Sequence, residues 1–69
     1  MKKRNFDIII PIYNEGYSIV RLIRLIKKYL NKEKFNIILC YDSIKDDVFD
    51  HKKEIKKINL PIYFMKNKF

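Results

Sequence analysis

Two short polar segments of this chain carry the side chains best suited to bind a ligand. Tyr13, Asn14 and Glu15 follow an apolar run that ends near Pro11, and Asp42 follows a second apolar run. An aromatic ring such as that of Tyr13 offers a stacking face to any nucleobase. The carboxylates of Glu15 and Asp42 can accept hydrogen bonds from sugar hydroxyls or ring N–H groups. The pattern fits a nucleotide site, with solvated turn and helix-capping residues as the alternative interpretation.

Two predicted strands would position these segments. Phe6–Pro11 contains three consecutive isoleucines, and β-branched residues in a row favour an extended backbone. Phe35–Tyr41 is also almost continuously apolar. Such runs predict strands buried on both faces of a parallel sheet. In open α/β sheets ligands bind beyond the carboxyl ends of the strands, which is where both polar segments would lie.

A first helix is predicted between these strands. Gly16 is expected in the loop before it, Ser18 is a plausible N-cap, and Asn31 can close it after Leu30. The helical spacing predicts an apolar stripe on the sheet, made of Ile19, Leu22, Ile23, Ile26 and Leu30. The residues expected to face away are Arg21, Arg24, Lys27 and Lys28.

A second, weaker helix and a last strand are predicted after the second strand. Asp46 can cap this helix, and Asp47 adds a charge that suits a helix N-terminus. His51 is expected to be structural or solvated. Leu60–Met65 would form a short strand with Pro61 near its start. The apolar positions of the helix are Val48, Ile55 and Ile58.

The order strand-helix-strand-helix-strand predicts an α/β fold with a three-stranded parallel sheet, in the order 3-2-1, and connections like those of a Rossmann-like half. Right-handed crossovers that progress in one direction place both helices on one sheet face. The other face would be bare, and the first strand would be an open apolar edge. Monomers avoid both features. We therefore interpret residues 1–69 as a single partial domain, the amino-terminal half of a larger enzyme shortened by truncation or gene decay.

Length and cysteine content limit the class of protein. The chain has 69 residues, and a domain of this size buries only about 60% of the surface of its unfolded chain. One cysteine, Cys40, excludes an internal disulfide or a Cys-based zinc site and fits a reducing compartment. No apolar run approaches the roughly 18 residues of a membrane span, and no signal peptide is expected. The expected location is the cytoplasm, with peripheral association at the inner face of the membrane left open.

The formal net charge is +8, from 16 Lys and Arg against 8 Asp and Glu. Such a charge attracts phosphates in nucleic acid, anionic lipid or nucleotides. The basic residues are scattered, however, and the abundance of Lys, Ile, Asn, Phe and Tyr is typical of A+T-rich coding. No specific nucleic-acid partner is predicted. A small basic module that binds RNA or an acidic membrane surface stays as an alternative function.

The segments IIIPIYNEG and IILCYDSIKDD, with a helix between them, resemble the start of family-2 glycosyltransferases of the GT-A fold. In that family the first strand ends in a P-x-Y-N-E-like loop and the second in a D-D-x-S-x-D-like loop. The second match is degraded, because Tyr41 stands at the usual first aspartate and Ser43-Ile44 replaces Gly-Ser. Asp42 and Asp46 keep the other acidic positions. The resemblance extends from Phe6 to about Asn67.

The resemblance implies a role for four residues. Pro11 would shape the nucleotide pocket, and Tyr13 would lie against the base. Glu15 would accept hydrogen bonds from ribose hydroxyls, and Asp42 from the edge of uracil or guanine. The complete enzyme would move a sugar from a UDP- or GDP-linked donor, a nucleotide-diphosphate sugar, to a hydroxyl or lipid-phosphate acceptor.

The resemblance also implies what this fragment lacks. In the family the metal-binding DxD, which holds Mg or Mn, the general base and the acceptor site all follow the third strand. No catalytic residue and no metal ligand is therefore assigned, and the missing C-terminal half of the domain is an expected partner. The fragment alone is expected to bind nucleotide weakly and to transfer no sugar. A non-functional remnant that associates through its bare face is a further alternative.

A cluster of four aspartates needs a separate interpretation, because such a cluster could substitute for the missing metal site. Asp46 and Asp47 open the predicted helix, so loop and capping roles are favoured over metal binding. Carboxylates without a divalent ion would also repel a diphosphate. The four aspartates are Asp42, Asp46, Asp47 and Asp50.

Overall fold

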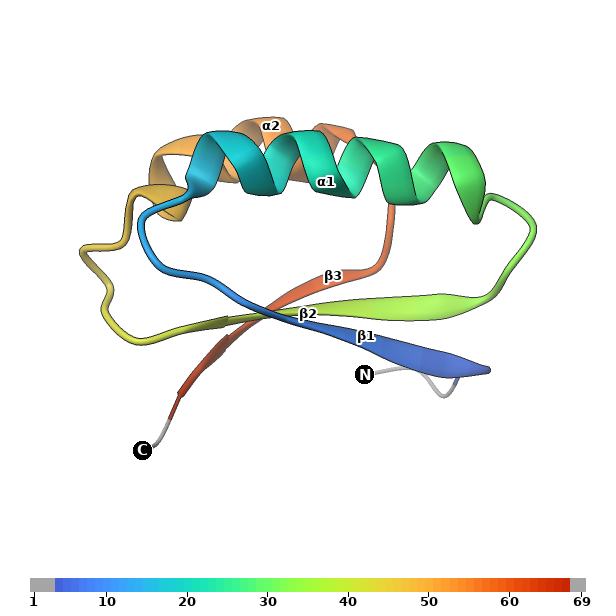
Figure 1. Cartoon of the computed structure of the whole chain (residues 1–69), viewed down its shortest axis with the longest axis horizontal. Coiled ribbons are helices and arrows are strands. Elements are labelled where there is room, and N and C mark those ends of the chain that lie inside the picture. Colours follow the sequence, from blue (N-terminus) through green and yellow to red (C-terminus); the bar gives the residue numbers. More distant parts are fainter. Residues whose placement is uncertain (1–3, 68–69) are drawn as a thin grey trace.

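The computed structural model describes residues 4–67, which form a three-stranded parallel sheet with its helices on one face (Figure 1). The elements in chain order are β1 (Phe6–Pro11), α1 (Gly16–Tyr29), β2 (Phe35–Tyr41), the 3₁₀ helix η1 (Asp47–His51), α2 (Lys52–Lys57) and β3 (Ile62–Lys66). The strands lie in the order β1-β2-β3, so β2 is the central strand. The predicted α/β class, the parallel three-stranded sheet and the two helices are confirmed.

The hydrophobic core lies between β2 and the helices. Ile37 and Leu39 of β2 are fully buried, as are Ile23 of α1 and Ile55 of α2. Burying one such side chain contributes about 1.5–3 kcal/mol. The prediction that the second strand is buried on both faces is confirmed, since residues 35–39 are all buried.

β1 is an edge strand, and the prediction that both of its faces are buried is wrong. Ile8 and Ile10 are partly buried against the core, but Ile9 between them is 64% exposed. The helices cover one face of the sheet only (Figure 1), and successive strand residues point to opposite faces. The consecutive isoleucines therefore cannot all be covered within the described residues.

The opposite face of the sheet, called here the bare sheet face, is apolar. Its residues alternate with the core residues and follow the strand register in two rows. These rows are Ile9–Ile38–Tyr63 and Pro11–Cys40–Met65. At the start of the strands the amide nitrogen Nδ2 of Asn36 donates to Oδ1 of Asp7 at 3.0 Å.

The first helix begins earlier than predicted. Gly16 is the first residue of α1, not a loop residue, and Ser18 lies within the helix. The N-cap is Glu15, whose side chain makes no capping hydrogen bond. At the other end the C-cap is Leu30, so Asn31 does not close the helix. The helix can start at Gly16 because a carboxylate at the start of η1 accepts a hydrogen bond from the Gly16 N–H.

The second helical segment starts as the 3₁₀ helix η1. Asp46 is its N-cap, as predicted, and Oδ1 of Asp46 accepts from the N–H of Val48 at 2.9 Å. After α2, Asn59 has a φ of 62°, a left-handed conformation that Asn tolerates better than most residues. β3 begins two residues later than predicted, at Ile62. Pro61 precedes it, and the Pro61 carbonyl accepts from the N–H of Ile37 at 2.8 Å.

Two side chains of α1 differ from the predicted pattern. Leu22, expected against the sheet, is 40% exposed. Lys27, expected to face away, donates from Nζ to the carbonyl oxygen of Ile58 at 2.5 Å and so links α1 to the end of α2. Within residues 4–67, neither helix has the length and apolar character required to cross a bilayer.

Candidate functional site

The candidate site lies where β1 and β2 end. Residues 12–15 connect β1 to α1, and residues 42–46 connect β2 to η1. The buried residue Ile12 donates its N–H to the carbonyl of Cys40 at 2.9 Å, which continues the pairing one residue beyond β1. The two loops therefore leave the sheet from neighbouring positions.

Asn14 joins the two loops through a reciprocal pair of hydrogen bonds. Its N–H donates to Oδ2 of Asp46 at 2.9 Å, and its side-chain Oδ1 accepts from the N–H of Asp47 at 3.2 Å. The φ of Asn14 is 48°, in the left-handed region that Asn populates more readily than most other residues. Because the two bonds run in opposite directions, they fix both the spacing and the orientation of the loops.

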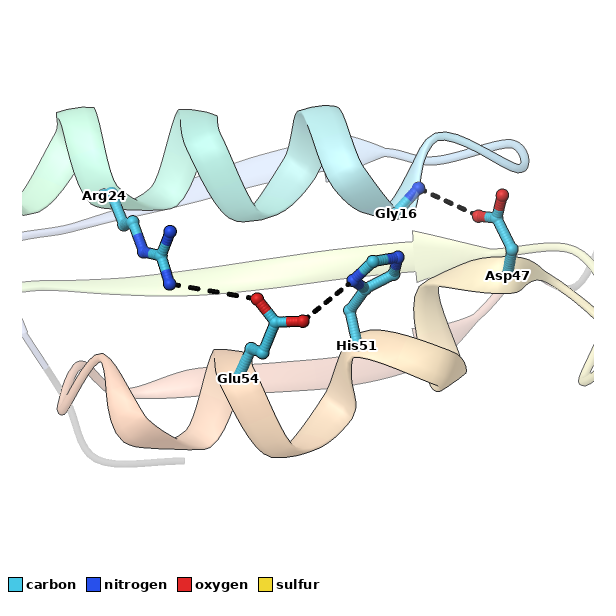
Figure 2. A network of polar contacts seen from close by, with 5 residues as sticks. All are labelled: Gly16, Arg24, Asp47, His51 and Glu54. Carbon is cyan, nitrogen blue, oxygen red and sulfur yellow. Dashed lines mark hydrogen bonds and ion pairs between the residues drawn. The ribbon is translucent and has the colours of Figure 1, made fainter.

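The carboxylates of Asp46 and Asp47 organise the starts of both helices. Asp46 is only 7% exposed, and its two oxygens accept the N–H groups of Asn14 and Val48. Oδ1 of Asp47 accepts from the N–H of Gly16 at 2.8 Å (Figure 2). A carboxylate from the first residue of η1 thus satisfies the first amide of α1, so the helix does not need Ser18 as its cap.

Gly16 permits the close approach of α1 to η1. An added Cβ would lie 2.5 Å from Cδ2 of His51 and 3.0 Å from both the Asp47 carbonyl oxygen and the Val48 Cα. The His51 ring is also held by Glu54, whose Oε1 lies 3.3 Å from Nδ1 (Figure 2). The glycine is required here for space, since its φ is not positive.

A pocket of about 180 Å³ opens between the two loops. Tyr13, which is 71% exposed, contributes from the first loop, and Asp42 contributes an exposed carboxylate from the second. The structure therefore brings these two predicted residues together. The full lining is Tyr13, Asn14, Asp42, Ser43, Lys45 and Asp46.

The other two predicted residues do not line this pocket. Pro11 is the last residue of β1 and lies in a row of the bare sheet face. Glu15 is exposed at the start of α1, and its backbone carbonyl accepts from the N–H of Ile19 at 2.9 Å. The pocket thus unites two of the four predicted side chains.

Sequence reasoning missed the contributions of Ser43 and Lys45. The Ser43 hydroxyl accepts from the backbone N–H of Lys45 at 3.1 Å, which folds the second loop toward the pocket. Lys45 places an ammonium group beside an otherwise acidic and polar lining. The available signal was that Lys45 is the only cation between the second apolar run and the helix that follows.

The described residues do not fit a divalent metal ion. Within residues 4–67 no three His, Cys, Asp or Glu side chains come close enough to hold one. Both oxygens of Asp46, and one oxygen of Asp47, already accept backbone N–H groups. Asp42 alone would give a metal a single protein carboxylate, so these residues do not form a metal site without ligands from another source, such as phosphates.

Comparisons with known proteins add no independent identification. Protein-family models, curated proteins and solved structures were compared with the chain, and none of them matches it. The pocket therefore has to be interpreted from its own residues and geometry.

Proposed function

We propose that the pocket binds the base of a nucleotide-diphosphate sugar, with UDP and GDP as the expected nucleotides. The chain would serve as the nucleotide-binding part of a family-2 glycosyltransferase, its sheet and helices being the Rossmann-like half of a GT-A fold. The observation that carries this proposal is that Tyr13 and Asp42, from loops after adjacent parallel strands, line one pocket. Ligands of open α/β sheets bind at this edge.

Three of the lining residues have side chains suited to parts of the nucleotide. The exposed ring of Tyr13 can stack on a base, an interaction that contributes about 1–3 kcal/mol. The Asp42 carboxylate can accept hydrogen bonds from the ring N–H of uracil or guanine. Lys45 can approach the diphosphate as a flexible point charge. Glu15, next along the chain from Asn14, is proposed to accept from the ribose hydroxyls, and Pro11 to shape the end of β1.

We expect the chain to bind nucleotide weakly and to transfer no sugar. The pocket volume of about 180 Å³ is below the roughly 300–1,000 Å³ typical of small-molecule sites, so the pocket suits a base better than a whole nucleotide. The described residues do not by themselves form a site for the Mg or Mn ion that the family uses. The bare sheet face supports the further proposal that another part of the domain packs there.

Calorimetric titration of the chain with UDP and GDP tests this proposal. Tyr13→Ala should raise the Kd roughly tenfold or more because it removes the ring that stacks on the base. Asp42→Asn should raise it by a similar factor because a neutral amide oxygen is a weaker acceptor than a carboxylate. Tyr29→Ala is the matched control for the ring, since Tyr29 has the same 71% exposure on α1. Asp50→Asn is the matched control for the carboxylate, since Asp50 is exposed in η1.

Two results would contradict the proposal. One is the absence of UDP and GDP binding at concentrations far above those of the protein. The other is inorganic diphosphate binding as tightly as UDP, with Tyr13→Ala and Asp42→Asn without effect, because the affinity would then come from charge alone.

A further inference from the structure

The outer side of α1 is a second surface with a distinct chemistry. Ile19 and Ile23 of α1 are buried against the sheet. Residues on the opposite side of α1 therefore point to solvent. Leu22 and Leu25 on this outer side are 40% and 50% exposed. We call the following set the basic helix face: Arg21, Leu22, Leu25, Lys28 and Tyr29.

Cations surround the exposed leucines. A hollow of about 290 Å³ on this side of α1 is lined by Arg21, Arg24, Leu25 and Lys28. α1 contains no Asp or Glu. Arg24 is directed toward α2, where its Nη2 lies 3.8 Å from Oε2 of Glu54 (Figure 2). The positive charge of Arg21 and Lys28 therefore remains available on the outer side.

The neighbouring helix extends the same positive surface. α2 lies beside α1 on the same side of the sheet (Figure 1), and its buried residue Ile55 faces the core. Lys53 and Lys57 are exposed and lie on the opposite side of α2 from Ile55. The only acidic residue within α2 is Glu54. The two helices thus present cations in one layer, with apolar side chains of α1 among them.

We propose that the basic helix face docks onto an anionic lipid surface, with α1 lying in the plane of the membrane. Arg21 and Lys28 would contact lipid phosphates, and Leu22 and Leu25 would enter the boundary between headgroups and acyl chains. Tyr29 would lie at headgroup level, where amphipathic rings are favoured. The basic helix face is complementary in charge to an anionic membrane because its five residues include two cations and no carboxylate.

The leucines favour lipid over nucleic acid as the partner. Single-stranded nucleic acid is bound by cations together with aromatic rings that stack on bases, and the basic helix face has one such ring, Tyr29, against two exposed leucines. Exposed aliphatic side chains gain nothing from phosphates, but they are stabilised by transfer into the apolar part of a bilayer. The surface is separate from the proposed nucleotide pocket, so the two proposals can fail independently.

Co-sedimentation of the full chain with vesicles tests this proposal. The chain should bind phosphatidylcholine vesicles that contain phosphatidylglycerol, and it should bind pure phosphatidylcholine weakly. Arg21→Glu with Lys28→Glu should weaken binding roughly tenfold or more, since each cation near an anionic surface contributes roughly a fivefold gain. The matched control is Lys34→Glu with Lys66→Glu, which makes the same charge change at exposed positions outside the helices and should weaken binding less.

A second variant separates insertion from charge. Leu22→Ser with Leu25→Ser keeps every cation and should also weaken vesicle binding roughly tenfold, while circular dichroism shows that the helices persist. Equal losses in the two charge-reversal variants would overturn the proposal, because binding would then follow net charge only. Tighter binding to single-stranded RNA than to vesicles, unchanged in the leucine variant, would also overturn it.

Discussion

The two acidic walls of the pocket differ sharply in what their carboxylates do. On the buried wall, Asp46 is 7% exposed and accepts two backbone N–H groups, one from Asn14 in the first loop and one from Val48 in η1. On the open wall, Asp42 is exposed, and within residues 4–67 its side chain takes part in no hydrogen bond or ion pair. These aspartates are four residues apart in one loop, yet one holds the fold and the other is available to a ligand.

This difference shows that burial and backbone contacts, and not residue type, separate an aspartate that stabilises the fold from one that is accessible to a ligand. Removing a buried acceptor leaves N–H groups unsatisfied, which costs free energy of folding. Removing an exposed side chain changes stability by about 0.5 kcal/mol or less in either direction. Mutation of Asp46 should therefore lower the free energy of unfolding, whereas mutation of Asp42 should affect ligand binding and leave stability almost unchanged.

The largest effect is expected for Asp46→Ala. The change removes the acceptor for the N–H groups of Asn14 and Val48, and should lower the free energy of unfolding by about 2–4 kcal/mol. Urea denaturation followed by circular dichroism measures this. Asp42→Ala is the paired variant, and its unfolding curve should overlay that of the wild type. Equal destabilisation by Asp46→Ala and Asp42→Ala would contradict the inference that only Asp46 stabilises the fold.

The next largest effect is expected for Gly16→Ala. The added methyl group meets the His51 ring and the backbone of η1, so unfolding should become easier by about 1–3 kcal/mol. Ser18→Ala, two residues further along α1, is the control and should be nearly neutral because Asp47 supplies the cap. Thermal unfolding of both variants measures the effects. A Ser18→Ala variant that is the less stable of the two would restore Ser18 as the N-cap.

A smaller effect is expected for Asn14, where two substitutions separate backbone strain from hydrogen bonding. Asn14→Ala loses the acceptor for the Asp47 N–H and also places at a φ of 48° a residue that tolerates the left-handed region less well than Asn, for a cost of about 1–2 kcal/mol. Asn14→Gly loses only the acceptor and should cost about 1 kcal/mol. Chemical denaturation of both variants measures the difference. An Asn14→Gly variant that is less stable than Asn14→Ala would show that the left-handed backbone is not the cause.

The strands β1 and β2 and the cap at Asp46 could be predicted because the residues that determine each of them are close together in the sequence. Continuous apolar runs gave the strands β1 and β2 with their observed bounds. Asp46 could be recognised as a cap because its acceptor role involves Val48, only two residues away. The exposure of Ile9 could not be read from β1 itself, because it depends on whether anything covers the other face of the sheet.

The details of the site depend on contacts between segments far apart in the chain. The bond from Gly16 to Asp47 spans 31 residues, and no pattern near Gly16 predicts it. Ser18 therefore looked like the N-cap, although the acceptor, Asp47, comes from the start of η1. Likewise, Glu15 belongs to the same polar segment as Tyr13, but the turn at Asn14 directs the chain into α1 and leaves Glu15 outside the pocket lining.

An NMR titration of the isotope-labelled chain with UDP and, separately, GDP tests most directly whether Tyr13 and Asp42 form one nucleotide-binding pocket at the ends of β1 and β2. If Tyr13 and Asp42 share one site, the amide signals of Tyr13, Asp42 and Lys45 should shift together with a single Kd. The amide signals of Ile9, Tyr63 and Lys53 should stay unchanged. Shifts at Tyr13 without shifts at Asp42, or shifts confined to the lysines of the helices, would contradict the proposal of one shared pocket.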